Sequence, residues 1–399
     1  MQHNSKNLAK RGIKRVVKAC VGAENSWRLQ RIFFPLLYPA EYKLARKQFD
    51  VLFFCDLPYR WQSIKLVVEE SRHRRNDLRL GVAFTGSREE LPPDSLNLAS
   101  ISTIAHVTTG VLNLFDTRIL YTTGSAPPLM MPPKARVVHS LISMLSLDGF
   151  FLDHSFDAHD YILCGGVHHF ESFRKLAFRR PALLGKKLLP AGYPKLDLML
   201  ASHSTKRRPT DQSVRSTVVY APTHSVALRH HGETIINALL AQGHRVIFRP
   251  HPFSLEGDRL VIDRICQLCA GNPNLSLDAS EDYTQSYSLA DLMVTDFSGT
   301  GFTFSFSFSR PCIFFAPNAD AERGLSGIQF DSRHRIGALV RDIDEMIEKT
   351  SELCNRDMAD EIERFRDETV FNVGKSAAYI VDCLEDILSG RERPEWVRL

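Results

Sequence analysis

Three short segments combine hydroxyl, imidazole and guanidinium side chains directly after runs of apolar residues. Residues 221–225 read Ala-Pro-Thr-His-Ser, residues 249–252 read Arg-Pro-His-Pro, and residues 296–301 read Asp-Phe-Ser-Gly-Thr-Gly. Hydrogen-bond donors and cations of this kind suit a ligand that carries phosphate. The candidate members of this site are Thr223, His224, Arg249, His251, Pro252, Asp296, Ser298, Gly299 and Thr300.

The segment 296–301 lies between a predicted strand and a helix-like segment. Its small residues would let backbone N–H groups approach phosphate oxygens, and the N-terminus of a helix adds partial positive charge. The alternative is a plain N-cap, in which Asp296 or Ser298 satisfies the first helical turn. We favour phosphate binding, because two other predicted strand ends carry matching side chains.

Two histidines are candidate catalytic residues. His251 lies between two prolines, which fix the backbone φ and stiffen the turn, so its ring is held beside Arg249. There it can bind or protonate a departing phosphate; the alternative is a structural turn with a surface histidine. His139 ends an apolar run and is a candidate base for an acceptor hydroxyl, with a buried core histidine as the alternative.

A parallel sheet would bring these segments together. Apolar runs alternate with helical patterns, which is typical of an open α/β sheet. Ligands bind outside the carboxyl ends of the strands of such sheets, so the side chains that follow the runs should converge. We expect strands within residues 49–56, 78–86, 118–123, 135–141, 160–166, 217–225, 244–252, 289–299 and 310–317, and helices within residues 61–74, 232–242 and 255–270.

Residues 302–309 read Phe-Thr-Phe-Ser-Phe-Ser-Phe-Ser, a strict alternation that by itself suggests a strand. A strand here would have to follow the segment 296–301 at once. We therefore predict a helix after a phosphate-binding loop, with its Phe side chains filling the space between helix and sheet.

The domain organisation follows from length and local composition. A chain of 399 residues predicts two or three domains. The polar, basic, proline-containing segment 201–216 is typical of a linker between domains. We predict an N-terminal Rossmann-like domain at 31–205, a C-terminal one at 206–375, and a closing helix and tail at 376–399. No repeat of solenoid length is visible.

Composition excludes several classes of protein. With 44% hydrophobic and 24% charged residues, the chain is an ordinary globular protein and not a disordered one. A net charge of +4 is too weak to indicate nucleic-acid binding, and no apolar run is long enough to span a bilayer. Cys266 and Cys269 have the spacing of a zinc-binding pair, but no second cysteine pair or nearby histidine completes a zinc site. We therefore expect neither a metal nor another cofactor.

Residues 1–30 begin with a basic amphipathic pattern. Such a helix can lie on an anionic membrane surface, and the alternative is a solvated helix that leads into the fold. Eight cysteines without an apolar signal segment indicate reduced thiols. We therefore expect a cytoplasmic protein, and the membrane alternative would make it peripheral on the inner face of the plasma membrane.

The segments at 220–225, 248–252 and 289–315 together resemble the donor half of the CDP-glycerol glycerophosphotransferases. Residues 191–200 are similar to that family's Gly-x-Pro-Arg-x-Asp stretch, with Lys195 in the Arg place. The resemblance implies a GT-B fold, which is two Rossmann-like domains facing a cleft. It also implies that the nucleotide donor binds the C-terminal domain and the acceptor the N-terminal one.

This chain departs from the family pattern at three points. The Trp-His-Gly motif on the acceptor side retains only His139, and the Ser-Ser pair of the donor loop is Ser298 followed by Gly299. The acidic residue that usually follows this loop is Thr303. The residues of the donor side therefore match the family pattern better than the residues of the acceptor side do.

The resemblance implies a transferase that moves glycerol phosphate or ribitol phosphate from a CDP-activated donor to a glycan or lipid-linked acceptor. Its products would be cell-surface polymers such as teichoic acid or capsule. His139 would take the acceptor proton, while His251 and Arg249 would stabilise the diphosphate as CMP leaves. The remaining donor-site residues would line the nucleotide side (Thr223, His224) and hold phosphate oxygens (Ser298, Gly299, Thr300).

Two other functions stay open at this point. One is a GT-B glycosyltransferase that uses a CMP-sugar or a UDP-sugar, since a His-Pro element and a serine-containing phosphate loop also suit those donors. The other is a binding protein that keeps the GT-B fold without activity, which the incomplete Trp-His-Gly motif would fit.

Overall fold

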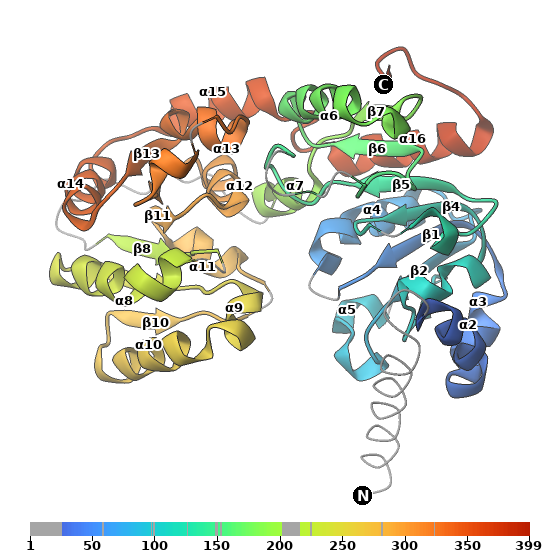
Figure 1. Ribbon diagram of the computed structural model, residues 1–399, viewed down its shortest axis with the longest axis horizontal. Helices are drawn as coiled ribbons and strands as arrows, with labels where there is room; N and C mark the ends of the chain where they lie inside the picture. Colours follow the sequence, from blue (N-terminus) through green and yellow to red (C-terminus); the bar gives the residue numbers. More distant parts are fainter. Residues whose placement is uncertain are drawn as a thin grey trace, which may run out of the picture.

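The structure is a computed structural model in which two sheets lie side by side, each surrounded by helices (Figure 1). The basic segment expected at the N-terminus lies mostly outside the described residues, and so does most of the expected linker. The described residues are 26–57, 60–96, 98, 100–125, 127–147, 151, 154–201, 216–223, 226–280, 282–322 and 324–399.

The first sheet has eight strands in the order β14-β7-β6-β5-β4-β1-β2-β3. All neighbours are parallel except β14, which pairs antiparallel with β7. Counted from β1, the parallel strands follow the 3-2-1-4-5-6 order of a Rossmann sheet. The strands are β1 (Gln48–Cys55), β2 (Leu80–Phe84), β3 (Ser102–Ile104), β4 (Asp116–Thr122), β5 (Arg136–Ser140), β6 (Tyr161–Cys164), β7 (Lys187–Pro190) and β14 (Val397–Arg398).

Helices of the first half pack around this sheet. Helix α4 begins at Trp61 and ends at Arg74, as the sequence predicts, and buries Ile64 and Val67. The segment 87–116, for which the sequence predicts no element, forms short turns and the edge strand β3. The helices are α2 (Ser26–Leu37), α3 (Pro39–Ala45), α4 (Trp61–Arg74), α5 (Pro93–Leu96), α6 (Val167–Arg179), α7 (Pro194–Ala201) and α16 (Ser376–Ser389).

The second sheet repeats the same topology with six parallel strands in the order β10-β9-β8-β11-β12-β13. Its strands are β8 (Thr217–Tyr220), β9 (Arg245–Phe248), β10 (Leu275–Leu277), β11 (Leu292–Thr295), β12 (Cys312–Phe315) and β13 (Gly337–Val340). Its helices are α8 (Val226–Ala241), α9 (Pro252–Gly257), α10 (Arg259–Gly271), α11 (Thr284–Leu289), α12 (Gly299–Phe308), α13 (Ile328–Asp331), α14 (Ile343–Cys354) and α15 (Ala359–Thr369).

Helix α12 confirms the helix predicted from the alternating Phe segment. Phe302, Phe304 and Phe306 are fully buried, and the polar residues between them are buried too. Because the helix is enclosed on all sides, its sequence need not show the 3.6-residue period of a surface helix. Ser298 caps its N-terminus, and Ser309 ends it in the left-handed conformation with a φ of 54°.

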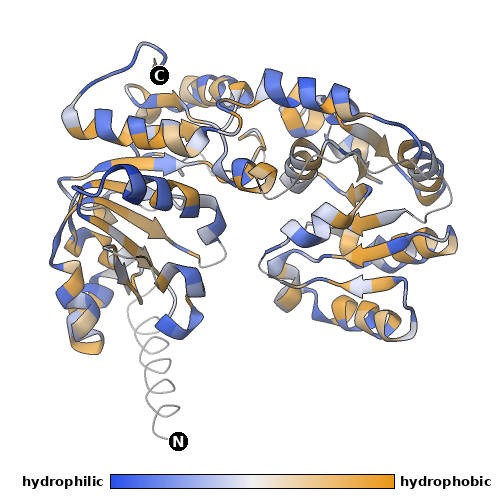
Figure 2. Ribbon diagram, turned by 180° about the vertical axis from the view of Figure 1, so that it is seen from behind, coloured by the Kyte–Doolittle hydropathy of each residue, from blue (hydrophilic) through white to orange (hydrophobic). Residues whose placement is uncertain are grey.

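The two halves have separate apolar cores, and the strands of both sheets are largely hydrophobic (Figure 2). The chain nevertheless returns to the first half after α15, because Ile380 and Leu384 of α16 and Trp396 belong to the core of the first sheet. Among the described residues, no helix is long and apolar enough to cross a membrane.

The two segments that cross between the halves are hydrogen-bonded to each other. The carboxylate of Asp197 in α7 accepts the backbone N–H groups of Gly374 and Ser376, both at 2.7 Å. Gly192, with a φ of +90°, lies against the backbone of Phe371. The segment that leaves the first sheet therefore touches the segment that returns to it.

Asp50 at the start of β1 provides a test of this fold by pH. Its carboxylate accepts three hydrogen bonds from Arg79, each 3.0 Å long, and these bonds lower its pKa to about 2 despite its burial. The unfolded pKa of Asp is higher, about 3.9, so the stabilisation is present above pH 4 and is lost as the pH falls towards 2.

Replacing Asp50 with Asn removes a carboxylate that Arg79 stabilises, so the free energy of unfolding near pH 7 should fall. The loss should be only about 1–2 kcal/mol, because Arg79 is half exposed and solvent screens its charge. The difference between wild type and Asp50→Asn should shrink between about pH 4 and pH 2. Urea unfolding of both proteins over that range measures it, and a difference that does not change with pH would contradict this assignment.

Candidate functional site

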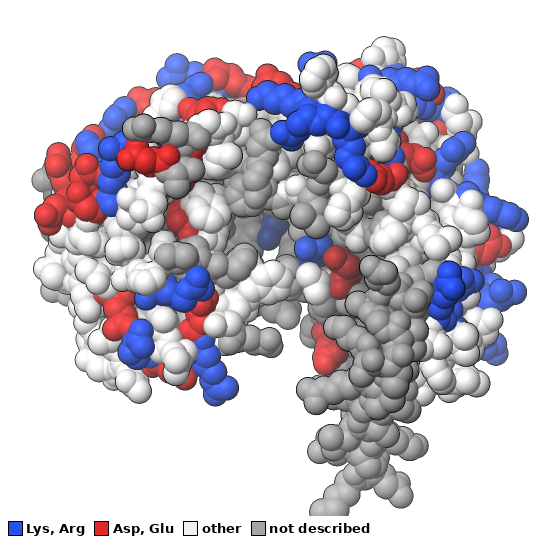
Figure 3. All heavy atoms as spheres, in the orientation of Figure 1, with Lys and Arg blue, Asp and Glu red and all other residues white. Residues whose placement is uncertain are grey.

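A cavity of about 1270 Å³ lies at the carboxyl edge of the second sheet. Loops that follow β8, β9, β10, β11 and β12 line it, and Ile142, Ser143 and Leu145 of the first half contribute to its wall. The molecular surface is hollowed between the two halves, with Lys or Arg side chains inside the hollow (Figure 3). This is the edge at which open α/β sheets bind ligands.

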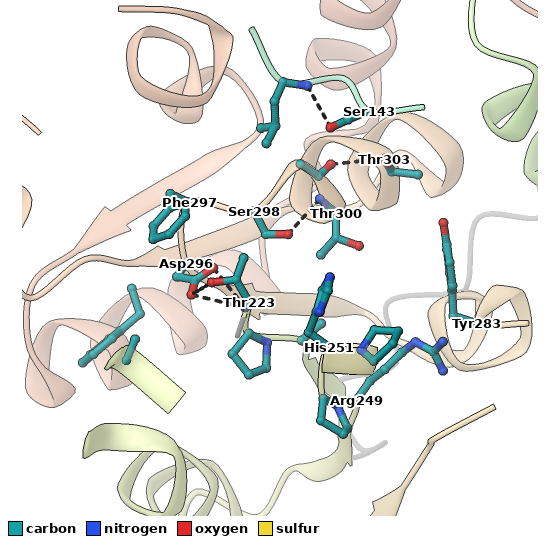
Figure 4. A pocket seen from close by; sticks show the side chains of 18 of the residues that line it. Ser143, Thr223, Arg249, His251, Tyr283, Asp296, Phe297, Ser298, Thr300 and Thr303 are labelled. Atoms are coloured by element: carbon teal, nitrogen blue, oxygen red, sulfur yellow. Dashed lines mark hydrogen bonds between the residues drawn. The ribbon is translucent and has the colours of Figure 1, made fainter. Parts of the chain in front are cut away.

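The floor of the cavity lies where the strand order reverses, between β8 and β11. The hydroxyl of Thr223 donates to a carboxylate oxygen of Asp296 over 2.6 Å, and the backbone N–H of Thr223 lies 3.2 Å from the same oxygen (Figure 4). Asp296 is 4% exposed. Both predicted residues line the cavity. The Thr223 hydroxyl proton is bonded to Asp296, so this hydroxyl can only accept a hydrogen bond from a ligand.

The N-terminus of α12 lies beside this floor. The Ser298 hydroxyl accepts the N–H of Thr300 at 3.2 Å, so the predicted N-cap is present, and Ser298, Gly299 and Thr300 still line the cavity. Gly299 brings the helix close to the first half, because an added Cβ would lie 2.7 Å from the Ser143 hydroxyl. The positive end of the helix therefore faces space that a phosphate can enter.

The loop after β9 supplies an imidazole and a guanidinium. Pro252 is the first residue of α9, and Nδ1 of His251 accepts the N–H of Phe253 at 3.2 Å. Since Nδ1 accepts, a neutral ring carries its proton on Nε2. Arg249 pairs with Asp278 at 2.7 Å, so part of its charge is already balanced within the protein.

The structure does not bring His139 to this cavity. The side chain lies inside the first sheet with 2% exposure, and its ring meets Phe156 and His159 edge-on. Burial, followed by the neighbouring His159, lowers its pKa well below the usual value. Its position supports the core alternative and not the predicted role as a base, because an enclosed ring cannot reach an acceptor hydroxyl.

We expect His139→Met to change turnover less than about threefold and the free energy of unfolding by less than about 1 kcal/mol. Nδ1 of His139 has no hydrogen-bond partner among the described residues, so an apolar side chain of similar size loses only the ring's backbone hydrogen bond with Gly124. Steady-state rates and urea unfolding of the variant measure both effects. A tenfold loss of turnover with an unchanged fold would restore the catalytic role.

The cavity collects all the predicted donor residues that the structure describes, while His224 lies outside the described residues. Sequence reasoning missed Tyr283, Glu322 and the role of Lys195, which also line it. Tyr283 and Glu322 come from segments without a motif, whereas Lys195 lies in the segment that resembles the Gly-x-Pro-Arg-x-Asp stretch and was assigned no role there. Among the described residues, no group of three His, Cys, Asp or Glu side chains could hold a metal ion.

Known structures share this architecture. The wall teichoic acid polymerase TagF gives a TM-score of 0.62 at 16% identity, covering 96% of this chain and 98% of that one. A UDP-GlcNAc 2-epimerase of Methanocaldococcus jannaschii, in complex with UDP-GlcNAc and UDP, gives a TM-score of 0.58 at 14% identity and covers 84% of this chain and 99% of that one. The likenesses show a GT-B fold and confirm the predicted fold class.

Sequence comparison gives the family. Teichoic acid poly(glycerol phosphate) polymerase of Bacillus subtilis (strain 168) is 26% identical over an alignment of 202 residues that covers 45% of this chain and 26% of that protein. The match thus spans about a quarter of the relative's length. The sequence model of the family described as CDP-Glycerol:Poly(glycerophosphate) glycerophosphotransferase matches residues 156–386, which is more than half of the chain. The chain therefore belongs to the CDP-glycerol glycerophosphotransferase family.

Proposed function

We propose that this protein is an enzyme that transfers glycerol phosphate or ribitol phosphate from a CDP-activated donor to a hydroxyl of a glycan or lipid-linked acceptor. Cell-surface polymer synthesis is the process that such a reaction serves. The observation that carries the proposal is the convergence of Arg249, His251 and the N-terminus of α12 on one cavity. The family match supports the same chemistry.

The donor would bind the second half, in the domain predicted at 206–375, and the acceptor would approach from the domain at 31–205. The acceptor oxygen forms a bond to the outer phosphorus, and the bond from that phosphorus to the bridging oxygen breaks. CMP leaves with the electron pair, and the hydroxyl proton goes to solvent. Nε2–H of His251 and the N-terminus of α12 stabilise the charge that develops on CMP.

Partners and location follow from this chemistry. A lipid-linked acceptor lies at a membrane, so a protein acting on it works at the cytoplasmic face, where CDP-activated donors are made. The basic N-terminal sequence supports contact with anionic lipid. Binding to phosphatidylglycerol-containing vesicles, compared with neutral vesicles, tests this part separately from activity.

The test of function offers the purified protein CDP-glycerol, CDP-ribitol, a CMP-sugar and a UDP-sugar, each with a lipid-linked or short glycan acceptor. Release of CMP from a CDP-polyol, with a product heavier by one polyol phosphate, is the expected result. If both CDP-polyols are inert and a sugar nucleotide is consumed, the protein is a glycosyltransferase. Tight CDP-glycerol binding without turnover on any acceptor would indicate an inactive binding protein.

A further inference from the structure

The cations on the cavity wall differ in how their charge is balanced. Arg229 pairs with Asp258 at 2.9 Å, and Arg249 pairs with Asp278 at 2.7 Å. Lys195 also lines the cavity, but no carboxylate of the described residues lies within ion-pair distance of its ammonium. No direct ion pair of the described residues therefore uses this ammonium, and an anion in the cavity can contact it.

An aromatic ring holds this ammonium in place. Nζ of Lys195 lies 4.2 Å from the centre of the Tyr283 ring, and the guanidinium carbon of Arg249 lies 5.0 Å from the same centre. The face of an aromatic ring attracts cations, so the Tyr283 ring makes cation–π contacts with both side chains. Figure 4 shows Tyr283 beside the Arg249 guanidinium at one end of the cavity. Burial lowers the pKa of Lys195, and the charge of Arg249 acts in the same direction, whereas Tyr193 and the more distant carboxylate of Asp282 oppose this shift.

Lys195 comes from a different part of the chain than its neighbours. It lies in the first turn of α7, directly after the first sheet, whereas Arg249 and Tyr283 belong to the second half. The helix is firmly seated: the Tyr193 hydroxyl donates to the carbonyl of Ile142 at 2.8 Å, one residue before α7 begins. The backbone from which the Lys195 side chain extends is thus held by a contact that does not depend on a ligand.

The part of the cavity formed by the segment after β12 has a different character. Glu322, near the end of β12, presents a carboxylate that Arg333 holds by two hydrogen bonds of 2.7 and 3.2 Å. Arg333 balances the charge of this carboxylate, whose oxygens can still accept hydrogen bonds from sugar hydroxyls. Asn318 and Phe330 add an amide and an aromatic face there. This part of the cavity suits a nucleoside.

The order of the strands indicates which way round a nucleotide would lie in the cavity. The ends of β9 and β12 are three strand spacings apart, with β8 and β11 between them. At about 4.8 Å for each spacing, the two ends are separated by about 14 Å. The N-terminus of α12, which follows β11, lies between them. A nucleoside diphosphate with its nucleoside near β12 would have its inner phosphate at α12 and its outer phosphate towards β9.

We propose that Lys195 binds the outer phosphate of the CDP-activated donor, the phosphate that is transferred, and that Tyr283 positions its ammonium for this contact. The inference rests on the proposed function, because it takes a cytidine diphosphate as the ligand. It adds a donor contact from the first half to a site that the sequence predicts within the second half alone. Lys195 is a binding residue here, and Tyr283 acts through it.

The experiment compares CMP with CDP, which differ by the outer phosphate. Isothermal titration of the full chain should give about 10- to 100-fold weaker CDP binding for Lys195→Met, with CMP binding changed less than about twofold. Lys195→Arg keeps the charge and should restore CDP binding to within about fivefold of wild type. An equal loss for both nucleotides, or no loss for CDP, overturns the proposal.

Two variants at Tyr283 separate the ring from its hydroxyl. Tyr283→Phe keeps the aromatic face and should bind CDP like wild type, whereas Tyr283→Leu should weaken CDP binding and leave CMP binding unchanged. Equal CDP binding by the Phe and Leu variants would overturn the positioning role. A wild-type chain that binds neither CMP nor CDP would instead overturn the proposed function, so the two failures are distinguishable.

Discussion

His251→Ala should lower the turnover of a CDP-polyol about 100- to 1000-fold. Because Nδ1 of His251 accepts the N–H of Phe253, the neutral ring offers Nε2–H as a donor. An oxygen of the departing CMP is the natural acceptor for it, since charge develops there as the bond to the outer phosphorus breaks. The measurement is CMP release at saturating donor and acceptor.

His251→Asn is the matched control for this prediction. An Asn side-chain oxygen can still accept the N–H of Phe253 and cap α9, so the thermal unfolding midpoint should stay near that of wild type. Its turnover should nevertheless fall as far as that of the alanine variant. If His251→Ala keeps more than a tenth of the wild-type rate, the histidine only shapes the turn.

Gly192→Ala should destabilise the protein by about 3 kcal/mol or more. The φ of +90° is unfavourable for a residue with a Cβ, and that Cβ would overlap the carbonyl oxygen of Phe371 and the hydroxyl of Ser376. A clash with backbone cannot be relieved by a rotamer change. Urea unfolding followed by fluorescence and circular dichroism measures the loss.

Gly243→Ala separates the two causes of this loss. Gly243 has a similar φ of +83°, but an added Cβ would meet nothing within 4 Å. Its alanine variant should therefore lose only about 1–2 kcal/mol, the cost of the backbone conformation. If the two glycine variants lose the same amount, the contact between Gly192 and the returning segment contributes nothing.

Much of the second half could be predicted because local patterns fix it. The apolar runs that became β8, β9 and β11 are short and end in polar residues, and parallel strands place such ends at one edge. The helix over 299–308 could be predicted only by its place after the loop, since its own alternation favours a strand. Its complete burial explains why the pattern misleads.

The rest depends on contacts that no local pattern encodes. His139 does lie near the end of a strand, as predicted, but residues 154–159 fold over this part of the sheet and enclose its ring with Phe156 and His159. Lys195 and Tyr283 are far apart in the sequence and meet only because α7 reaches the second half. Pairing between such distant segments is a property of the tertiary fold.

The return of the chain to the first half has a consequence for the order of folding. Residues 376–398 are synthesised after the whole second sheet, yet they complete the core of the first sheet and pair β14 with the edge of β7. A chain that emerges from its amino end must therefore keep the apolar surface around α4 and β4 uncovered while the second half forms. Apolar surface that stays uncovered during synthesis can aggregate until residues 376–398 arrive.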